Sequence, residues 1–228
     1  GYEPGDYLVT ANFGTRGADA VIRLEHRDVR RPLTVVGRLP RTQFSTEEVW
    51  LHPTAPVAYL GTGRGGDRMY AIDISDPANP VVTDSLMANT RRVNDVMTTP
   101  DGKFLVHTRE GAADRKNGIV IGSLEEPRHP KKIAEFTEGV TAGVHSAFVY
   151  HQEKHGTHVY LTNNGTGAIH IIDINDPYNP KEVAQWRVER TEAGRITHDI
   201  DVQNGLAYLS YWNDGLVVLD VGNGVKGG

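Results

Sequence analysis

The chain has 228 residues, of which 38% are hydrophobic and 23% are charged, and its formal net charge is −5 at pH 7. These values are ordinary for a soluble globular protein, and the negative balance excludes a general attraction for nucleic acid or for an anionic membrane. The sequence holds no cysteine, which excludes disulfides, thiolate metal sites and cysteine nucleophiles. No apolar run approaches the roughly 20 residues that a membrane-spanning helix requires. The chain opens without methionine or a basic leader, so we expect that any targeting segment has been removed or lies outside this sequence.

The first 46 residues contain two strand-like segments and an arginine-rich stretch. DYLVTANF and VIRLEHRD have the apolar character of strands from an incomplete unit of the repeat found downstream. The stretch from Arg23 to Arg41 carries six arginines against two acidic residues. Such a run is usually a solvated surface. The alternative is a docking site for an acidic partner through Arg27, Arg30 and Arg31.

From residue 47 onwards a phrase recurs at an interval of 50 residues. IDISDPANP begins at Ile72, the weaker copy GSLEEPRHP begins at Gly122, and IDINDPYNP begins at Ile172. In each copy an acidic residue followed by proline suits the start of a turn. The second proline directs the residue before it into extended geometry, so each phrase predicts a turn that leads into a strand.

The unit around each phrase contains four short strand patterns. In the most complete copy, His158 to Trp186, two strand patterns flank a tight turn for which positive φ angles are predicted at Asn164-Gly165, and the phrase leads into a third. Another strand pattern precedes these in each unit: RVNDVMTT, GVHSAFVY and ITHDIDVQ. Strand-rich repeats of roughly 40 to 50 residues are typical of β-propellers. We therefore predict an all-β propeller of four-stranded antiparallel blades, each about 50 residues long.

The repeat divides the chain, which we interpret as a single propeller domain over residues 1–228. Blades are predicted at residues 47–91, 92–142 and 143–195, between partial blades at 1–46 and 196–228. An open ring would leave apolar faces and strand edges bare. The partial blades therefore either complement each other in a five-bladed ring or belong to a larger ring of which this chain is an incomplete portion. The terminal NGVKGG favours the larger ring, because it has the composition of a connection.

The third strand pattern of each unit predicts close packing between blades. IHIIDI and LVVLDV are apolar at both odd and even positions, so we expect both faces of these strands to be covered. Asp73, Asp173 and Asp220 recur within the same strands. Because they belong to different blades, we expect each carboxylate to accept hydrogen bonds from its own turn rather than to join a catalytic or calcium site.

These segments resemble the LVIVD-repeat family, whose third strand is followed by an Asp-Pro…Pro turn. The resemblance rests on YAIDISDPANP, IHIIDINDPYNP and LVVLDV; Ser123 replaces the aspartate in the third unit, and the first unit keeps only the pattern. It implies an exported or surface-associated β-propeller without an assigned activity. Selenium-binding propellers of the methanethiol oxidase type are more distantly similar. Their cysteine signature is absent here, so their chemistry is not implied.

The first strand of a propeller blade lines the central channel, and here its opening residues are polar. Equivalent positions include Glu48, Asn94, Asp95, His145, His198 and Asp199. We predict that these side chains converge at one mouth of the channel, where His145, His198 and Asp199 are candidate ligands for a divalent metal. No two of the candidates share a strand at a recognised metal spacing. The favoured alternative is therefore that these side chains cap the channel through hydrogen bonds to neighbouring blades.

Trp212 lies near a predicted hairpin tip and is the candidate for an exposed protein-binding or sugar-binding surface, against the alternative of a contact between blades. The whole pattern favours a non-catalytic, periplasmic or extracellular propeller that binds protein partners as a scaffold. It would be an accessory subunit of a larger complex, peripheral to a membrane where that complex is anchored. One alternative is a metal-dependent enzyme with its site at the channel mouth, and a second is a carbohydrate-binding propeller. No cofactor other than that divalent metal and no nucleic-acid partner is expected. The sequence leaves the partner, the blade number and the oligomeric state open.

Overall fold

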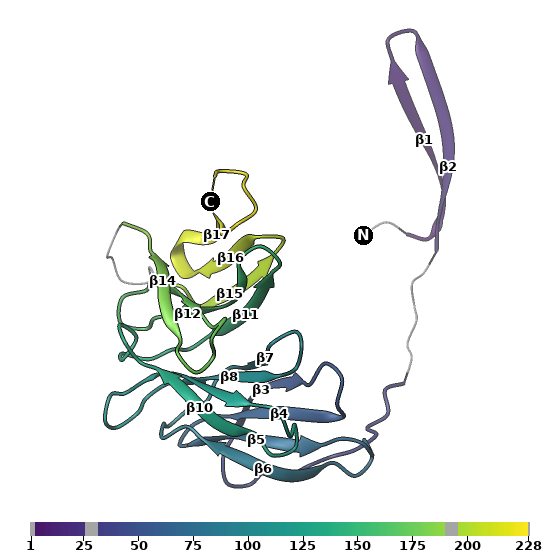
Figure 1. Ribbon diagram of the computed structural model, residues 1–228. Coiled ribbons are helices and arrows are strands. Elements are labelled where there is room, and N and C mark those ends of the chain that lie inside the picture. Colours follow the sequence, from purple (N-terminus) through teal and green to yellow (C-terminus); the bar gives the residue numbers. More distant parts are fainter. Residues whose placement is uncertain (1–2, 26–31, 190–195, 228) are drawn as a thin grey trace. The chain divides into compact units, whose positions relative to one another are not determined.

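The computed structural model describes residues 3–25, 32–189 and 196–227 and is built almost entirely of β-strands (Figure 1). It divides into two compact units, Gly1–Val35 and Val36–Gly228. Arg27, Arg30 and Arg31 lie outside the described residues, so the arginine surface stays a prediction. Among the residues that are described, no helix has the length and apolar character needed to cross a membrane.

The first unit is an antiparallel hairpin of β1 (Gly5–Phe13) and β2 (Arg16–Leu24). Leu8 and Val21 are register partners, and each is 66% exposed. A two-stranded hairpin by itself is at best marginally stable in water. The segment DYLVTANF lies within β1, whereas VIRLEHRD overlaps β2 only over residues 21–24 and ends outside the described residues. The membership of both segments in a partial blade stays a prediction.

The second unit contains three four-stranded sheets and one three-stranded sheet, all antiparallel and each with its strands in chain order. The first sheet comprises β3 (Thr46–Leu51), β4 (Val57–Thr62), β5 (Arg68–Asp73) and β6 (Val81–Met87). The second comprises β7 (Val96–Thr98), β8 (Phe104–Arg109), β9 (Gly118–Ser123) and β10 (Lys131–Phe136). The third comprises β11 (Ala147–Gln152), β12 (Gly156–Thr162), β13 (Ile169–Asp173) and β14 (Lys181–Trp186). The fourth comprises β15 (Asp199–Gln203), β16 (Leu206–Tyr211) and β17 (Gly215–Asp220), with a short 3-10 turn, η1, at Trp212–Asp214.

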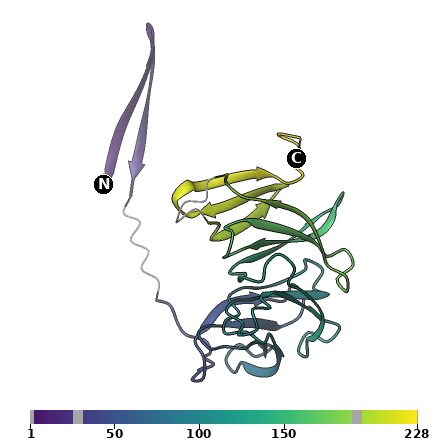
Figure 2. The same cartoon turned by 90° about the vertical axis from the view of Figure 1, so that its left-hand side faces the viewer.

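The four sheets follow one another around an arc. The innermost strands β3, β7, β11 and β15 contact each other in that order. Figure 2 shows this succession from the blue to the yellow sheets, and the described strands do not close it into a ring. The prediction of an all-β propeller of four-stranded blades, present as an incomplete portion of a ring, is therefore confirmed.

The repeated phrase forms the same corner in successive sheets. Asp73 Oδ1 accepts the Ser75 backbone N–H at 2.8 Å, and Asp173 Oδ1 accepts the Asn175 N–H at 2.7 Å. Asp220 Oδ2 likewise accepts the Lys226 N–H at 2.7 Å. The prediction that each aspartate serves its own turn is therefore confirmed, because carboxylates satisfy the backbone donors that a turn leaves free.

Apolar side chains fill the spaces between neighbouring sheets. At matching positions of the third strands, Met69, Ile119 and Ile169 are all fully buried. Their counterpart in β17, Leu216, is 70% exposed, because no other sheet among the described residues packs against that face. Coverage of both faces is thus confirmed for IHIIDI and not for LVVLDV.

Candidate functional site at the channel and its rim

The polar side chains at and near the starts of the innermost strands lie in two groups, or levels, at one end of the second unit. On the channel side, Glu48 Oε2 accepts the Val96 N–H at 2.9 Å, and Asp95 Oδ2 accepts the Ala147 N–H at 3.0 Å. Each carboxylate thus reaches from its own sheet to the innermost strand of the next. Asn94 Nδ2 donates to the other oxygen of Asp95 at 2.6 Å. The side chains form the bonds between blades that the capping hypothesis requires.

These carboxylates line a channel cavity of about 350 Å³, together with Asp199 and apolar side chains such as Trp50 and Phe148. Burial raises the pKa of Glu48 to about 7, and the charges of Asp95 and Asp199 add to the effect against the hydrogen bond from Val96. Burial likewise raises the pKa of Asp95. The cavity therefore holds carboxyl groups whose ionisation is disfavoured.

The second level, which we call the channel rim, is a network centred on Glu110. Its Oε2 lies 3.0 Å from His145 Nδ1 and 3.3 Å from Arg92 Nη1, while Oε1 accepts from Asn164 Nδ2 at 2.9 Å. Arg92 Nε also lies 3.5 Å from Glu47 Oε1. The carboxylate is held by three neighbours and joins the second sheet to the third.

This network shifts the ionisation of its members. The hydrogen bond to Glu110 raises the pKa of His145, and burial opposes that rise. For Glu110, burial acts to raise the pKa of the carboxyl. The hydrogen bond from His145 and the charges of His145 and Arg92 outweigh burial, so the net pKa is lowered. Both groups are therefore stabilised in their charged forms.

A row of rings continues the rim onto the fourth sheet. The ring centroid of His198 lies 5.0 Å from that of His145 and 5.7 Å from that of Trp212, which meets it edge-on. Trp212 is 57% exposed. A surface hollow of about 460 Å³ adjoins the row and includes Tyr211 and Leu216. The row presents an exposed aromatic side chain beside an apolar depression.

The structure divides the candidate metal ligands between the two levels. His145 and His198 lie together on the rim, whereas Asp199 lines the channel cavity and accepts the Ile200 N–H at 2.8 Å. Within residues 3–25, 32–189 and 196–227, no group of three or more histidine and carboxylate side chains is arranged to hold a metal ion. A divalent metal at this site stays a prediction.

Sequence reasoning missed Glu110, Arg92 and Asn164. Glu110, Asn164 and Trp212 occupy the same place in the second, third and fourth sheets. Each lies three residues after the second-strand residue that pairs with the innermost strand, namely His107, Leu161 and Leu209. An alignment of the repeat units that extended past the end of each second strand would have shown that these three positions are equivalent.

Comparison with known proteins agrees with this architecture. A family model for the LVIVD repeat matches residues 63–88 and 194–224. No curated protein matches the chain. A hypothetical selenium-binding protein from Sulfolobus tokodaii is similar, with a TM-score of 0.58 and 13% identity over 87% of this chain and 54% of that one.

Two further solved structures are similar. The β-propeller domain of Cps50 (Swd1) from Myceliophteria thermophila has a TM-score of 0.57 and 12% identity over 95% of this chain and 64% of that one. A putative 6-phosphogluconolactonase from Bacteroides fragilis has a TM-score of 0.51 and 15% identity over 60% of this chain and 37% of that one. This chain thus spans less than two thirds of each of these three structures. At these identities the likeness shows the fold alone. Taken with the repeated corners, the matches show LVIVD repeats at residues 63–88 and 194–224 within a β-propeller architecture.

Proposed function

We propose that the protein is a non-catalytic binding module that engages a protein partner at the channel rim. The observation that carries this proposal is the exposed Trp212 at the end of the row of rings, beside the apolar hollow. Aromatic side chains in such positions are enriched among the residues that dominate protein–protein affinity. Leu216, 70% exposed on the same hollow, adds apolar area that a partner would cover.

The geometry of the rim favours a fixed binding surface for a partner over a site for proton transfer. Glu110 is engaged by His145, Arg92 and Asn164 at once, so its carboxylate is fixed in an ionised form. A general base must have an oxygen free to take a proton within reach of a substrate. The network therefore supports a preorganised surface whose side chains lose little freedom on binding.

We further propose that the module works in the periplasm or at the cell surface as a scaffold or accessory subunit of a larger complex. This part rests on the resemblance to LVIVD-repeat proteins and on their implied address. A reporter fusion to the full-length gene product, assayed for activity outside the cytoplasm, tests it. A reporter that is active only in the cytoplasm would contradict it.

The central test is capture of the partner on immobilised protein from an extract of the source organism, followed by measurement of the affinity of the recovered protein. Trp212→Ala should weaken binding by about tenfold or more, as truncation of a hot-spot residue does. Tyr178→Ala is the matched control, because Tyr178 is 58% exposed on a turn of the third sheet and lies outside the rim. Equal affinity of wild type and Trp212→Ala, or recovery of no partner by the wild type, would refute the proposal.

A metal-dependent enzyme is the second candidate, and the closeness of the His145 and His198 rings favours it. Elemental analysis of protein purified without chelators distinguishes the two functions. A stoichiometric metal that is lost from the His145→Ala, His198→Ala double variant would establish the alternative, and metal-free wild-type protein would refute it.

A further inference from the structure

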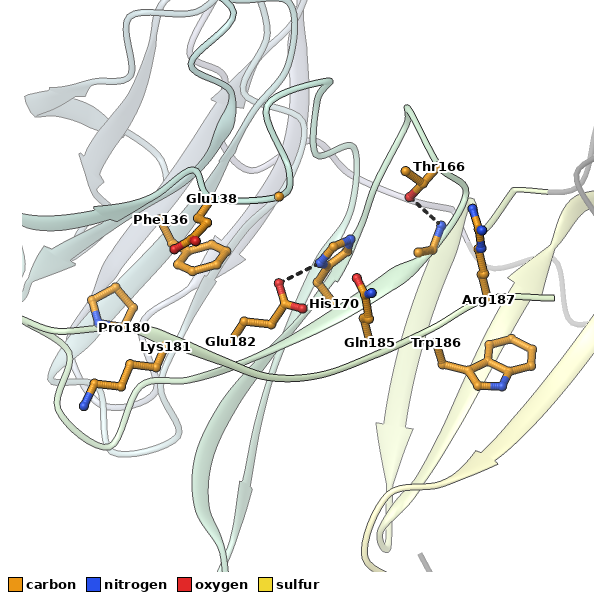
Figure 3. A pocket seen from close by; sticks show the side chains of 12 residues that line it. Phe136, Glu138, Thr166, His170, Pro180, Lys181, Glu182, Gln185, Trp186 and Arg187 are labelled. Carbon is orange, nitrogen blue, oxygen red and sulfur yellow. Dashed lines mark hydrogen bonds and ion pairs between the residues drawn. The ribbon is translucent and has the colours of Figure 1, made fainter. Parts of the chain in front are cut away.

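A large outer groove lies away from the channel, on the third sheet. It has a volume of about 880 Å³ and is lined by β13, β14, the turn before β13 and the segment that follows β10. Figure 3 shows His170 and Glu182 at its centre, Arg187 and Thr166 towards one end, and Lys181 towards the other. None of its lining residues belongs to the channel cavity or to the hollow at the rim. Its volume suits a small-molecule site.

A buried histidine at the centre of the groove fixes one of its carboxylates. His170 is 3% exposed, and its Nε2 lies 3.1 Å from Asn163 Nδ2. Asn163 Oδ1 accepts the Gly165 N–H, which identifies Nδ2 as the donor to the imidazole. The imidazole proton therefore resides on Nδ1 and is donated to Glu182 Oε2 at 3.0 Å. One oxygen of Glu182 is thus fixed, and the other is left as an acceptor on the groove.

The fold itself does not require this polar arrangement. Strand register places Tyr70, Val120 and Val217 at the position of His170 in the other three sheets. A polar residue that is buried where its counterparts are Tyr or Val costs free energy unless its bonds are satisfied. The third sheet therefore contains a polar network that positions the Glu182 carboxylate, in a place where the repeat otherwise uses aromatic or aliphatic packing.

The groove offers polar groups rather than an aromatic surface. The ring of Trp186 meets that of Tyr211 edge-on, with 5.9 Å between the centroids. Trp186 thus serves the contact between the third and fourth sheets, on the face of β14 opposite to Glu182 and Gln185. Phe136, which also lines the groove, is only 6% exposed. A ligand that requires a stacking surface is therefore disfavoured.

Unengaged side chains lie on either side of the fixed carboxylate. Gln185 and Arg187 are exposed and make no hydrogen bond with the described residues. The charged lining residues are two acidic, Glu138 and Glu182, and two basic, Lys181 and Arg187. The groove thus carries no formal net charge, and Arg187 is the cation of one end while both carboxylates lie away from it. This distribution suits a ligand that carries one positive and one negative end.

The strand register gives the distance between the two charges. Glu182 lies opposite Ile172, and Trp186 lies opposite Ile169, three residues away along β13. At a rise of about 3.3 Å per residue, these two pairs are about 10 Å apart. Arg187 is the next residue, so the carboxylate and the guanidinium start about 13 Å apart along the strand. An extended peptide spans at most about 3.5 Å per residue, so about four residues bridge them.

We propose that the outer groove binds a short free oligopeptide of about four residues. Its terminal ammonium binds the open oxygen of Glu182, and its terminal carboxylate accepts two parallel hydrogen bonds from the Arg187 guanidinium. Gln185 lies between them and offers both a carbonyl and an amide to the peptide groups in the middle. An inorganic anion would engage only the cations, and an apolar ligand would leave the fixed carboxylate without a partner.

The test begins with a library of tetrapeptides with free termini, screened against the whole chain. Calorimetry then compares the best-bound tetrapeptide with its N-acetylated and C-amidated forms. Each modification removes one terminal charge and should weaken binding by about tenfold, because hydrogen bonds between charged groups are the strongest that the groove can form. A library without a binder would overturn the proposal, and so would an affinity that either modification leaves unchanged.

Two variants assign the termini of the peptide to their residues. Arg187→Ala should weaken binding of the free tetrapeptide by about tenfold and abolish the effect of amidation. Glu182→Gln should likewise abolish the effect of acetylation. Arg187 is exposed, and Glu182→Gln keeps a carbonyl acceptor for the Nδ1 proton of His170, so both variants should fold. Amidation that still weakens binding to Arg187→Ala by the wild-type factor would contradict the proposed orientation and overturn the proposal.

Two controls separate the groove from the rest of the surface. Lys131→Ala removes an exposed cation of β10 that does not line the groove, and Trp212→Ala removes the exposed tryptophan of the rim. Both should leave the affinity for the tetrapeptide unchanged. Weaker binding to Trp212→Ala would place the peptide at the rim and overturn the groove as its site. The protein partner proposed for the rim has its own affinity measurement, so failure of the groove leaves that proposal standing.

Discussion

The second and third sheets each bury a histidine, and the two side chains meet opposite conditions. His107 in β8 is completely buried, and neither of its ring nitrogens has a hydrogen-bond partner among the described residues. His170 in β13 is almost as deeply buried, yet Asn163 and Glu182 engage both of its nitrogens. Burial of a polar group is costly only where its bonds are lost. His107 therefore costs stability, whereas the two hydrogen bonds of His170 offset the cost of its burial.

The repeat sharpens this contrast. Register places Leu60, Leu161 and Leu209 at the position of His107 in the other sheets. The second sheet thus carries a polar replacement that its neighbours do not satisfy. Arg109, two residues further on, is also buried, and within the part of the chain that the structure describes only its Nη1 is engaged, by Glu135 at 3.1 Å. Equal positions in a repeat protein therefore need not have equal energetics.

The largest effect is expected from acid. Burial lowers the pKa of His107 to about 4 from 6.5, and the charges of Arg109 and Lys132 add to the shift. Between these two values the unfolded chain binds a proton that the folded chain does not, so stability falls as the pH drops through this window. The shift corresponds to about 3 kcal/mol once the pH is below the folded pKa.

Urea denaturation of the wild type from neutral pH to about pH 4 measures this loss. His107→Leu should remove much of it and raise stability at neutral pH by about 1–3 kcal/mol. If His107→Leu were less stable than the wild type at both pH values, it would contradict the claim that burial of His107 destabilises the fold.

The same substitution in the third sheet should act in the opposite direction. His170→Leu removes the acceptor of one Asn163 Nδ2 N–H and the donor to Glu182 Oε2, while Asn163 Nδ2 still donates to Gly139 O at 2.8 Å. The buried N–H that loses its acceptor carries most of the cost. We expect the free energy of unfolding to fall by about 1–2 kcal/mol at neutral pH. Denaturation beside His107→Leu under identical conditions provides the comparison. A stabilised His170→Leu protein would show that its hydrogen bonds contribute nothing.

The smallest of these effects belongs to the channel rim. Glu110 raises the pKa of His145, so the pair stabilises the folded protein at pH values below 6.5, the pKa of this histidine in the unfolded chain. This stabilisation is lost as the pH rises through the higher pKa of His145 in the folded protein. The ion pair is half-buried, so its contribution is about 0.5–1 kcal/mol. NMR titration should show the pKa of His145 falling in Glu110→Gln. An unchanged His145 titration would mean that Glu110 does not govern it.

Much of the fold follows from the sequence because the repeated corner is local. Asp76 and Asn79 form their hydrogen bond across three residues, so the phrase itself contains both partners. One local detail was wrong: the positive φ in the turn predicted at Asn164-Gly165 belongs to Gly167, at 69°. Asn163 accepts from Gly165 instead and helps to hold His170.

The candidate sites were harder to predict because their partners are distant in the chain. The approach of His145 to His198 follows from equal positions in successive units, and it could be inferred. The pairing of Glu110 with His145 spans 35 residues and depends on strand register and on the packing of two sheets.

The contrast between the two buried histidines is tested most directly by a long-range ¹H–¹⁵N NMR spectrum of the imidazoles, recorded across a pH titration. The account predicts that His107 stays neutral until the pH approaches about 4 and that His170 at neutral pH carries its proton on Nδ1. Protonation of His107 near pH 6.5, or a proton on Nε2 of His170, would contradict it.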